Sequence, residues 1–109
     1  MGVDLIGKET STHFNWANWS YLLSVGRNHG WQPAGTSSPE RNIMDGSEVL
    51  FPDWEGGYGS NDGQKVTVDD ATNLAAALET YLATAPVEHV GFIRRFITFC
   101  RKSDGFYIT

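Results

Sequence analysis

The residues with the clearest capacity for chemistry lie in one stretch, "DWEGGYGSNDGQ", residues 53–64. It combines carboxylates, amides and two aromatic side chains with several glycines, a composition typical of loops that bind a ligand or turn the chain. We expect Trp54 to pack in the core, whereas for Tyr58 a core position and an exposed contact position are equally compatible with the sequence. The candidate binding residues are Trp54, Glu55, Tyr58, Asn61, Asp62 and Gln64.

Turn formation explains part of this stretch. Asn61, Asp62 and Gly63 tolerate the positive φ angles that tight turns require, and they lie shortly before a helix start. The sequence therefore predicts a turn over Asn61–Gly63, whether or not the preceding residues bind a partner.

Two familiar ligand loops do not fit residues 53–64. An EF-hand needs acids or amides at alternate positions before its glycine, but before Gly63 only Asp62 meets that need. A phosphate-binding P-loop needs Gly-Lys-Ser/Thr opening a helix, whereas here Asp53 and Glu55 would repel phosphate. Neither calcium nor phosphate binding is predicted for this loop.

The remaining reactive side chains form no catalytic or metal-binding pattern. His89 and Cys100 fall on one predicted helix about three turns, or ~16 Å, apart, so they cannot form a nucleophile–base pair. Cys100 is expected to serve as a small core residue. No histidine pair has the spacing of a zinc site: the histidines are His13, His29 and His89. We therefore predict no catalytic residues, no metal and no cofactor.

Length and composition indicate one globular domain over residues 1–109. No apolar run is long enough for a signal peptide or a membrane span, and Cys100 is the one cysteine, so we expect a cytoplasmic protein that does not contact membrane. The net charge is −5, and residues 41–80 hold eight of the acids. This charge argues against a nucleic-acid partner, and the basic run at 94–102 is interpreted as a solvated helix face.

Three helices are predicted from apolar periodicity. The first spans about Trp16 to His29, the second runs from about residue 68 to 85, and the third covers about residues 87–102. Asn15 and Thr67 are expected to cap the first two helices. The broad apolar face of the third helix must pack on two elements or leave area for a homodimer, so monomer and homodimer both stay open.

Glycine and short β-prone segments complete the predicted architecture. Gly26 lies on the apolar face of the first helix, where a close approach of the second helix would explain it. Residues 3–6 and 106–109 are expected to pair as terminal strands, and "SEVLF", residues 47–51, is a further candidate strand. The predicted fold class is α+β, with three main helices packed on a small antiparallel sheet built from the terminal segments.

Several motifs together resemble a group of small, uncharacterised bacterial proteins. The motifs are GWxPxGT at 30–36, WxGGY at 54–58, NDGQxVTxxDAxxLAxAL at 61–78 and FxxFCR at 96–101. The resemblance implies a bacterial or phage-related protein and brings no assigned activity or catalytic residues.

The function that we expect from sequence is a non-enzymatic binding or interaction module with a protein partner, of the inhibitor or immunity type. Its contact surface would comprise residues 51–64 and 31–41. The alternative is a small-ligand-binding domain or minimal enzyme that uses the 53–64 loop. Its apolar cleft would have four residues at its mouth: Trp54, Tyr58, Asn61 and Gln64.

Overall fold

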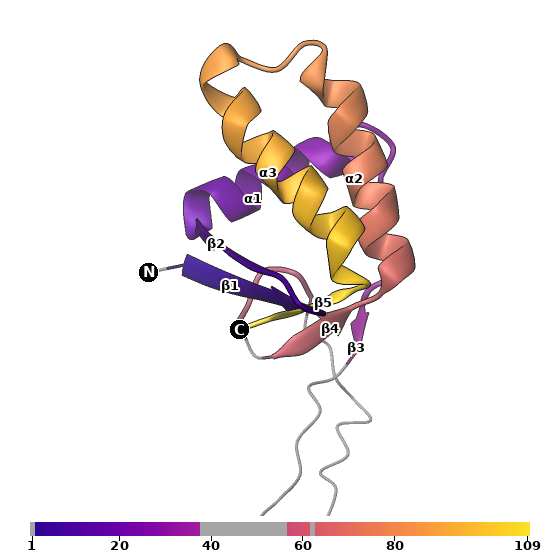
Figure 1. Ribbon diagram of the computed structural model, residues 1–109. Coiled ribbons are helices and arrows are strands. Elements are labelled where there is room, and N and C mark those ends of the chain that lie inside the picture. The colour runs from indigo at the N-terminus through magenta and orange to yellow at the C-terminus, as the bar shows by residue number, and fades with distance from the viewer. Residues whose placement is uncertain (1, 38–56, 62) are drawn as a thin grey trace, which may run out of the picture.

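The fold is an antiparallel sheet covered on one face by three helices. The computed structural model describes residues 2–37, 57–61 and 63–109, and the candidate strand at 47–51 lies outside them. The elements in chain order are β1 (Gly2–Gly7), β2 (Ser11–Asn15), α1 (Trp16–Asn28), β3 (Thr36–Ser37), β4 (Gln64–Val66), α2 (Val68–Leu82), α3 (Val87–Ser103) and β5 (Phe106–Ile108). Figure 1 shows all three helices on the same side of the sheet. The predicted α+β class is confirmed.

The sheet is organised around the two chain termini. Its strand order is β2-β1-β5-β4-β3, and every neighbouring pair is antiparallel. β1 pairs with β5 so that Leu5 lies opposite Ile108, which confirms the predicted pairing of the terminal segments. β1, β5 and β4 therefore form the middle of the sheet, and β2 forms one of its edges.

Strand β2 is not among the strands expected from the sequence, in which residues 7–12 form a turn-rich stretch before the first helix. The connection between β1 and β2 is short: Gly7 N donates to Thr10 O at 2.8 Å, and only Lys8, Glu9 and Thr10 lie between the strands. β2 itself alternates exposed Ser11 and His13 with inward Thr12 and Phe14. Since Phe14 is the one large apolar residue in this alternation, the strand signal in the sequence was weak.

Aromatic packing joins the helices to the inner face of the sheet. The Trp19 ring of α1 meets Phe96 of α3 edge-on, with centroids 5.7 Å apart. Both rings also contact Phe106 of β5, at 6.4 and 6.3 Å. All three side chains are fully buried, so this cluster joins α1, α3 and the sheet in one core.

The helix starts follow the predicted caps. Asn15 Oδ1 accepts from Asn18 N at 2.7 Å, and Thr67 Oγ1 accepts from Asp70 N at 3.2 Å. Each side chain satisfies one N–H group that the first turn of the helix leaves without an intrahelical partner.

The second helix does lie close to Gly26, but a leucine side chain makes the contact and not the helix backbone. A Cβ on Gly26 would overlap the buried side chain of Leu74 in α2, and it would also lie against the Trp31 ring. Val68, the first residue of α2, is 46% exposed, although it continues the apolar side of that helix in the sequence.

The broad apolar face of α3 is largely used inside the domain. Its buried members lie against α2 and the sheet: Ile93, Phe96, Ile97, Phe99 and Cys100. Phe92 is partly buried and meets Phe14 of β2 with ring centroids 6.4 Å apart.

None of the helices in the described residues is long and apolar enough to cross a membrane.

The turn from α3 to β5 depends on a glycine that touches backbone. Gly105 has φ +86°, and a Cβ there would lie 2.9 Å from the carbonyl oxygen of Val66. We expect Gly105→Ala to lower the free energy of unfolding by about 2 kcal/mol, through positive-φ strain and this overlap.

Gly30→Ala is the matched control, because Gly30 has φ +95° but no atom within 4 Å of an added Cβ. Urea unfolding of both variants measures the difference. Equal losses would contradict a steric contribution at Gly105.

Candidate functional site

The structure places the sequence-predicted contact residues in different environments. Trp54, Glu55 and Asp62 lie outside the described residues. Asn61 is exposed, whereas Tyr58 and Gln64 are buried. Tyr58 and Gln64 therefore lie beneath the loop surface that a partner would touch, and not at the mouth of a cleft.

Tyr58 anchors the loop to the helices. Only 4% of the residue is exposed, and its hydroxyl donates to the carboxylate of Asp70. Its ring meets Trp31 edge-on at 5.1 Å, and its carbonyl oxygen accepts from Trp19 Nε1 at 2.6 Å. Burial, together with the neighbouring carboxylate, raises the pKa of Tyr58 well above its usual value.

Gln64 closes the same loop from the sheet side. Its amide nitrogen donates to Gly57 O at 2.8 Å and to Ser60 O at 2.7 Å. Because the residue is fully buried, these bonds replace the water that a surface glutamine would have. The polar character of Gln64 thus supports the loop backbone.

Asp70 is the centre of this arrangement. It lies in the first turn of α2, is 2% exposed, and accepts from Ala34 N at 2.9 Å and Gly35 N at 3.2 Å in addition to the Tyr58 hydroxyl. Its own carbonyl oxygen accepts from Trp31 Nε1 at 3.2 Å. One acidic residue thereby ties residues 31–35 and the loop at 57–58 to the start of α2.

The sequence alone indicates only a capping role for Asp70, which lies three residues after the expected cap Thr67. The residue type could have indicated the further role of Asp70. A capping box normally has Glu or Gln at this position, whose longer side chain reaches back to the cap residue. An aspartate there is shorter, which leaves its carboxylate available to donors from other segments.

A second, partly buried polar cluster joins the three helices. Tyr21 of α1 and Tyr81 of α2 are hydrogen-bonded through their hydroxyls, and His89 Nδ1 of α3 lies 3.2 Å from the Tyr21 hydroxyl. Burial and the bond to Tyr81 raise the pKa of Tyr21 to about 12. The cluster holds the three helices together.

Cys100 is positioned as a core residue, as its sequence context predicted. Its thiol is buried on α3, and burial raises its pKa, which disfavours the reactive thiolate. Within the described ranges, no group of three His, Cys, Asp or Glu side chains lies close enough to hold a metal ion.

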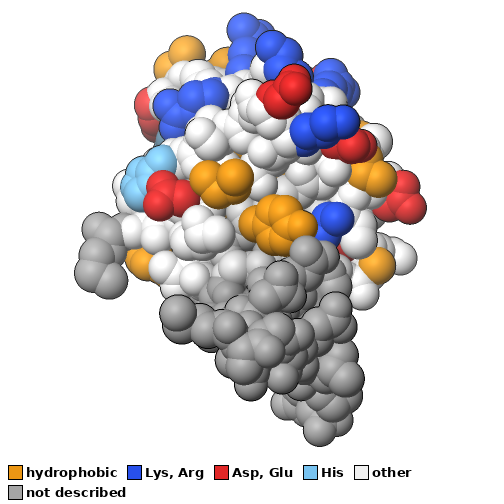
Figure 2. Space-filling model, turned by 60° about the horizontal axis from the view of Figure 1, so that its bottom comes forward, with side chains coloured by type: hydrophobic (Ala, Val, Ile, Leu, Met, Phe, Trp, Pro, Cys, Tyr) orange, Lys and Arg blue, Asp and Glu red, His pale blue; other side chains and the backbone are white. Residues whose placement is uncertain are grey.

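The open face of the sheet carries the surface feature that sequence reasoning missed. Ile6, Tyr107 and Lys65 lie side by side on the three central strands, because Ile6 pairs with Tyr107 and Tyr107 pairs with Lys65. Ile6 is 42% exposed, and Lys65 Nζ lies 5.8 Å from the centre of the Tyr107 ring. Figure 2 shows hydrophobic side chains in the middle of this face with a basic side chain beside them.

A hollow of about 270 Å³ extends this row toward the end of α3. Its walls include Lys8 from the β1–β2 turn and Asp104 from the α3–β5 turn. We call Ile6, Tyr107, Lys65 and this hollow the face site. It combines an aromatic side chain, an aliphatic side chain and charges at its border.

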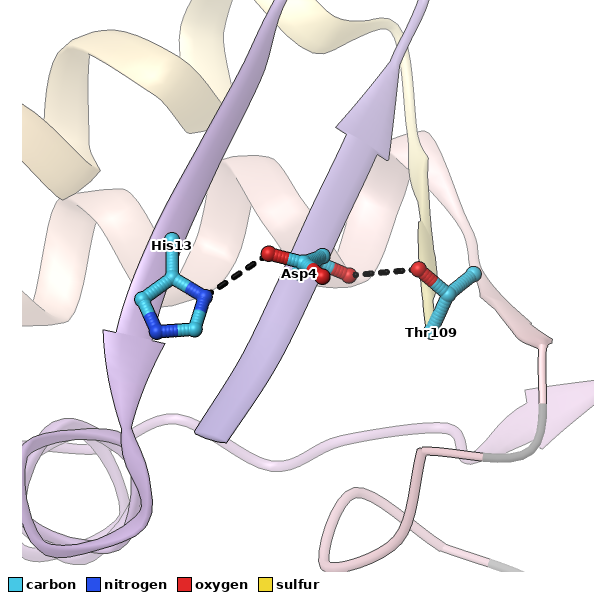
Figure 3. Close-up of polar contacts among 3 residues, drawn as sticks. All are labelled: Asp4, His13 and Thr109. Atoms are coloured by element: carbon cyan, nitrogen blue, oxygen red, sulfur yellow. Dashed lines mark hydrogen bonds and ion pairs between the residues drawn. The ribbon is translucent and has the colours of Figure 1, made fainter. Parts of the chain in front are cut away.

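Polar side chains border the face site along the neighbouring row of the sheet. His13 Nδ1 lies 2.7 Å from Asp4 Oδ1, and both side chains are more than half exposed, at 59% and 60%. Thr109 Oγ1 donates to the backbone oxygen of Asp4 at 3.3 Å, as Figure 3 shows. An exposed pair of this kind contributes little to stability, so its effect is mainly to set a polar border.

Comparison of the chain with protein-family models, with characterised proteins and with solved structures found no match. The resemblance to a group of small bacterial proteins stays a prediction.

Replacing Asp70 with Ala should lower the free energy of unfolding by about 3 kcal/mol, because the buried Tyr58 hydroxyl and two part-buried backbone amides lose their acceptor. The backbone amides of Ala34 and Gly35 should also exchange hydrogen faster. Asp69→Ala is the matched control: Asp69 lies in the same first turn but is exposed. Urea unfolding and hydrogen exchange measure both effects, and equal losses for the two variants would contradict the role of Asp70.

Alkaline pH should weaken the helix cluster through Tyr21. The folded-state pKa of about 12 exceeds the usual value of 10.0, so the folded state retains the proton longer than the unfolded state does. This contribution is therefore fully present below pH ~10 and is lost as the pH rises toward ~12.

Tyr21→Phe should flatten the decline of unfolding free energy between pH 9 and 11.5, measured by urea unfolding at ~0.5-unit intervals. Tyr107→Phe, which removes a phenol from the sheet surface, is the comparison variant. Identical slopes for wild type and Tyr21→Phe would refute the assignment.

Proposed function

We propose that the protein is a non-enzymatic binding module for a protein partner, which docks on the face site. The observation that carries the proposal is that, among the described residues, the helices cover one face of the sheet, while on the other face the central strands present an exposed Ile6 and a half-buried Tyr107. An aromatic residue beside an aliphatic one, with charges at the border, is the usual composition of an energetically important interface centre.

The buried polar groups support a binding role over a catalytic one. Asp70, Tyr58 and Gln64 are engaged in bonds that hold the loops, and Tyr21, Tyr81 and His89 hold the helices. Each of these groups is hydrogen-bonded within the fold. If it exchanged a proton with a substrate, it would lose a hydrogen bond that holds a loop or a helix in place.

The loop segments that sequence reasoning proposed as the contact surface are part of this proposal. Residues 31–35 and 57–60 are fixed by Asp70 and Gln64, which would present the adjoining exposed residues, such as Asn61, in a set position. We place the protein in the cytoplasm, because its one cysteine is a free thiol in the core and the fold uses no disulfide.

Affinity capture from the native cell lysate tests this function. Immobilised wild-type protein should retain a partner protein that the triple variant Ile6→Thr, Tyr107→Ala, Lys65→Glu retains at least about tenfold less, a loss of about 1.4 kcal/mol or more. Quantitative mass spectrometry of the retained proteins gives the ratio.

The control variant for this capture is Ser20→Ala, Ser24→Ala, which changes exposed positions on α1. It should retain the partner as wild type does. If both variants lose the partner equally, or both retain it equally, the result counts against the face site. If the wild-type protein retains no protein at all, the result counts against the binding function.

A further inference from the structure

We propose a second binding site at the edge of the sheet: the groove between β2 and α3 binds an extended acidic peptide, which adds a strand to β2. This site is separate from the face site and does not depend on it. We call it the edge groove.

The first observation is that, within the described part of the chain, β2 pairs only with β1 and so offers backbone groups along its other, free edge. Asp4 exchanges both of its backbone hydrogen bonds with Thr109, at 3.1 and 2.8 Å, so these groups point away from β2. Asp4 pairs with His13, and in an antiparallel ladder opposite residues either both bond across the pair or both point away from it. The backbone N–H and C=O of His13 therefore point to the free edge, and by alternation so do those of Ser11.

The second observation is a cavity of about 470 Å³ beside this edge. Thr10, Ser11 and Thr12 form one wall, and α3 forms the other through Arg94, Arg95 and Lys102. Figure 2 shows several Lys and Arg side chains along the upper part of the molecule in that view, with Asp and Glu side chains among them.

The groove is positively charged and its cations are available. None of the residues that line it is acidic. Arg101, the neighbouring cation on α3, is paired with Glu79 at 2.5 Å, whereas Arg94, Arg95 and Lys102 have no ion pair among the described residues. The Arg95 guanidinium lies 4.9 Å from the centre of the Phe14 ring, which holds it in place beside the strand.

The direction of the groove suits an added strand. Phe14 lies against Phe96 with centroids 5.7 Å apart, while Lys8 N donates to Ser103 O at 2.9 Å, so the β1–β2 hairpin runs alongside α3. Residues 94 and 102 are separated by ~12 Å along the helix axis. Three alternate residues of a strand span ~14 Å, so acidic side chains at alternate positions match the cations of α3.

These features together favour a peptide over other anions. Backbone groups at the edge bind an extended main chain, and the cations select the side chains that accompany it. A nucleic acid would use the cations but would leave the N–H and C=O groups of Ser11 and His13 without partners of matching spacing.

A defined probe tests the edge groove: a fluorescein-labelled heptapeptide in which Thr alternates with Glu, titrated into the full chain and followed by anisotropy. We expect saturable binding, and hydrogen exchange should show new protection at the amides of Ser11 and His13. A heptapeptide of the same composition with its Glu residues adjacent should bind about tenfold more weakly, because its charges no longer match alternate positions.

Gly91→Glu and Gly91→Gln form a matched pair of variants. Gly91 lines the groove on α3, and an added Cβ there meets no atom within 4 Å, so both replacements fit and both improve helix propensity. Gly91→Glu should weaken the alternating peptide about tenfold through like-charge repulsion, whereas Gly91→Gln should leave binding within about threefold of wild type.

Ser11→Pro tests the strand pairing separately from the charges. It removes an N–H that points to the free edge and breaks no bond to β1, so the fold should persist while peptide binding falls about tenfold. The thermal midpoint of each variant verifies that it is folded, and Ser11→Thr serves as the conservative control.

Several outcomes would overturn the edge groove. The first is that the alternating peptide does not bind the wild-type protein. The second is that the two peptides bind equally well and Ser11→Pro has no effect. The third is that a single-stranded oligonucleotide of the same charge binds more tightly than the alternating peptide does. The Ile6, Tyr107 and Lys65 variant should still bind the peptide, so failure of the face site and failure of the edge groove can be distinguished.

Discussion

The carboxylate of Asp70 is the interaction on which the loop side of the molecule depends. A buried carboxylate is costly unless donors surround it, and here two backbone amides and a phenol hydroxyl do so. Its position in the first turn of α2 adds the favourable field of the helix N-terminus. Because its donors come from residues 34–35 and from Tyr58, satisfying this one charge also fixes two segments that are far apart in sequence.

This constraint explains why the loop residues divide into supporting and exposed ones. Tyr58 and Gln64 carry polar groups that in the sequence look suited to a ligand, but both polar groups face inward. The interior therefore contains a polar network under the loops and an aromatic core under the helices. Exposed contact positions are left to residues such as Asn61 and to the open face of the sheet.

Local patterns predicted the helices well, because the caps Asn15 and Thr67 and the apolar periodicity lie within single segments. The terminal strands were also predictable from short β-prone runs at the ends. In contrast, β2 and β4 are short and rich in polar residues, so their identity as strands depends on partners distant in sequence. The burial of Gln64 and the role of Asp70 also depend on partners distant in sequence, so the periodicity of apolar residues around them does not predict either one.

The interpretation of the basic run of α3 changes once strand β2, which the sequence did not reveal, is placed beside it. Taken alone, residues 94–102 are a solvated helix face; with β2 alongside, three of the cations become one wall of a groove. An exposed edge strand invites pairing with a second copy of the same chain, which is a hazard for aggregation. Cations beside this edge oppose that pairing, since two copies would bring their basic walls together, and the same cations favour a strand of opposite charge. The charge beside β2 therefore both protects the edge and selects what is allowed to pair with it.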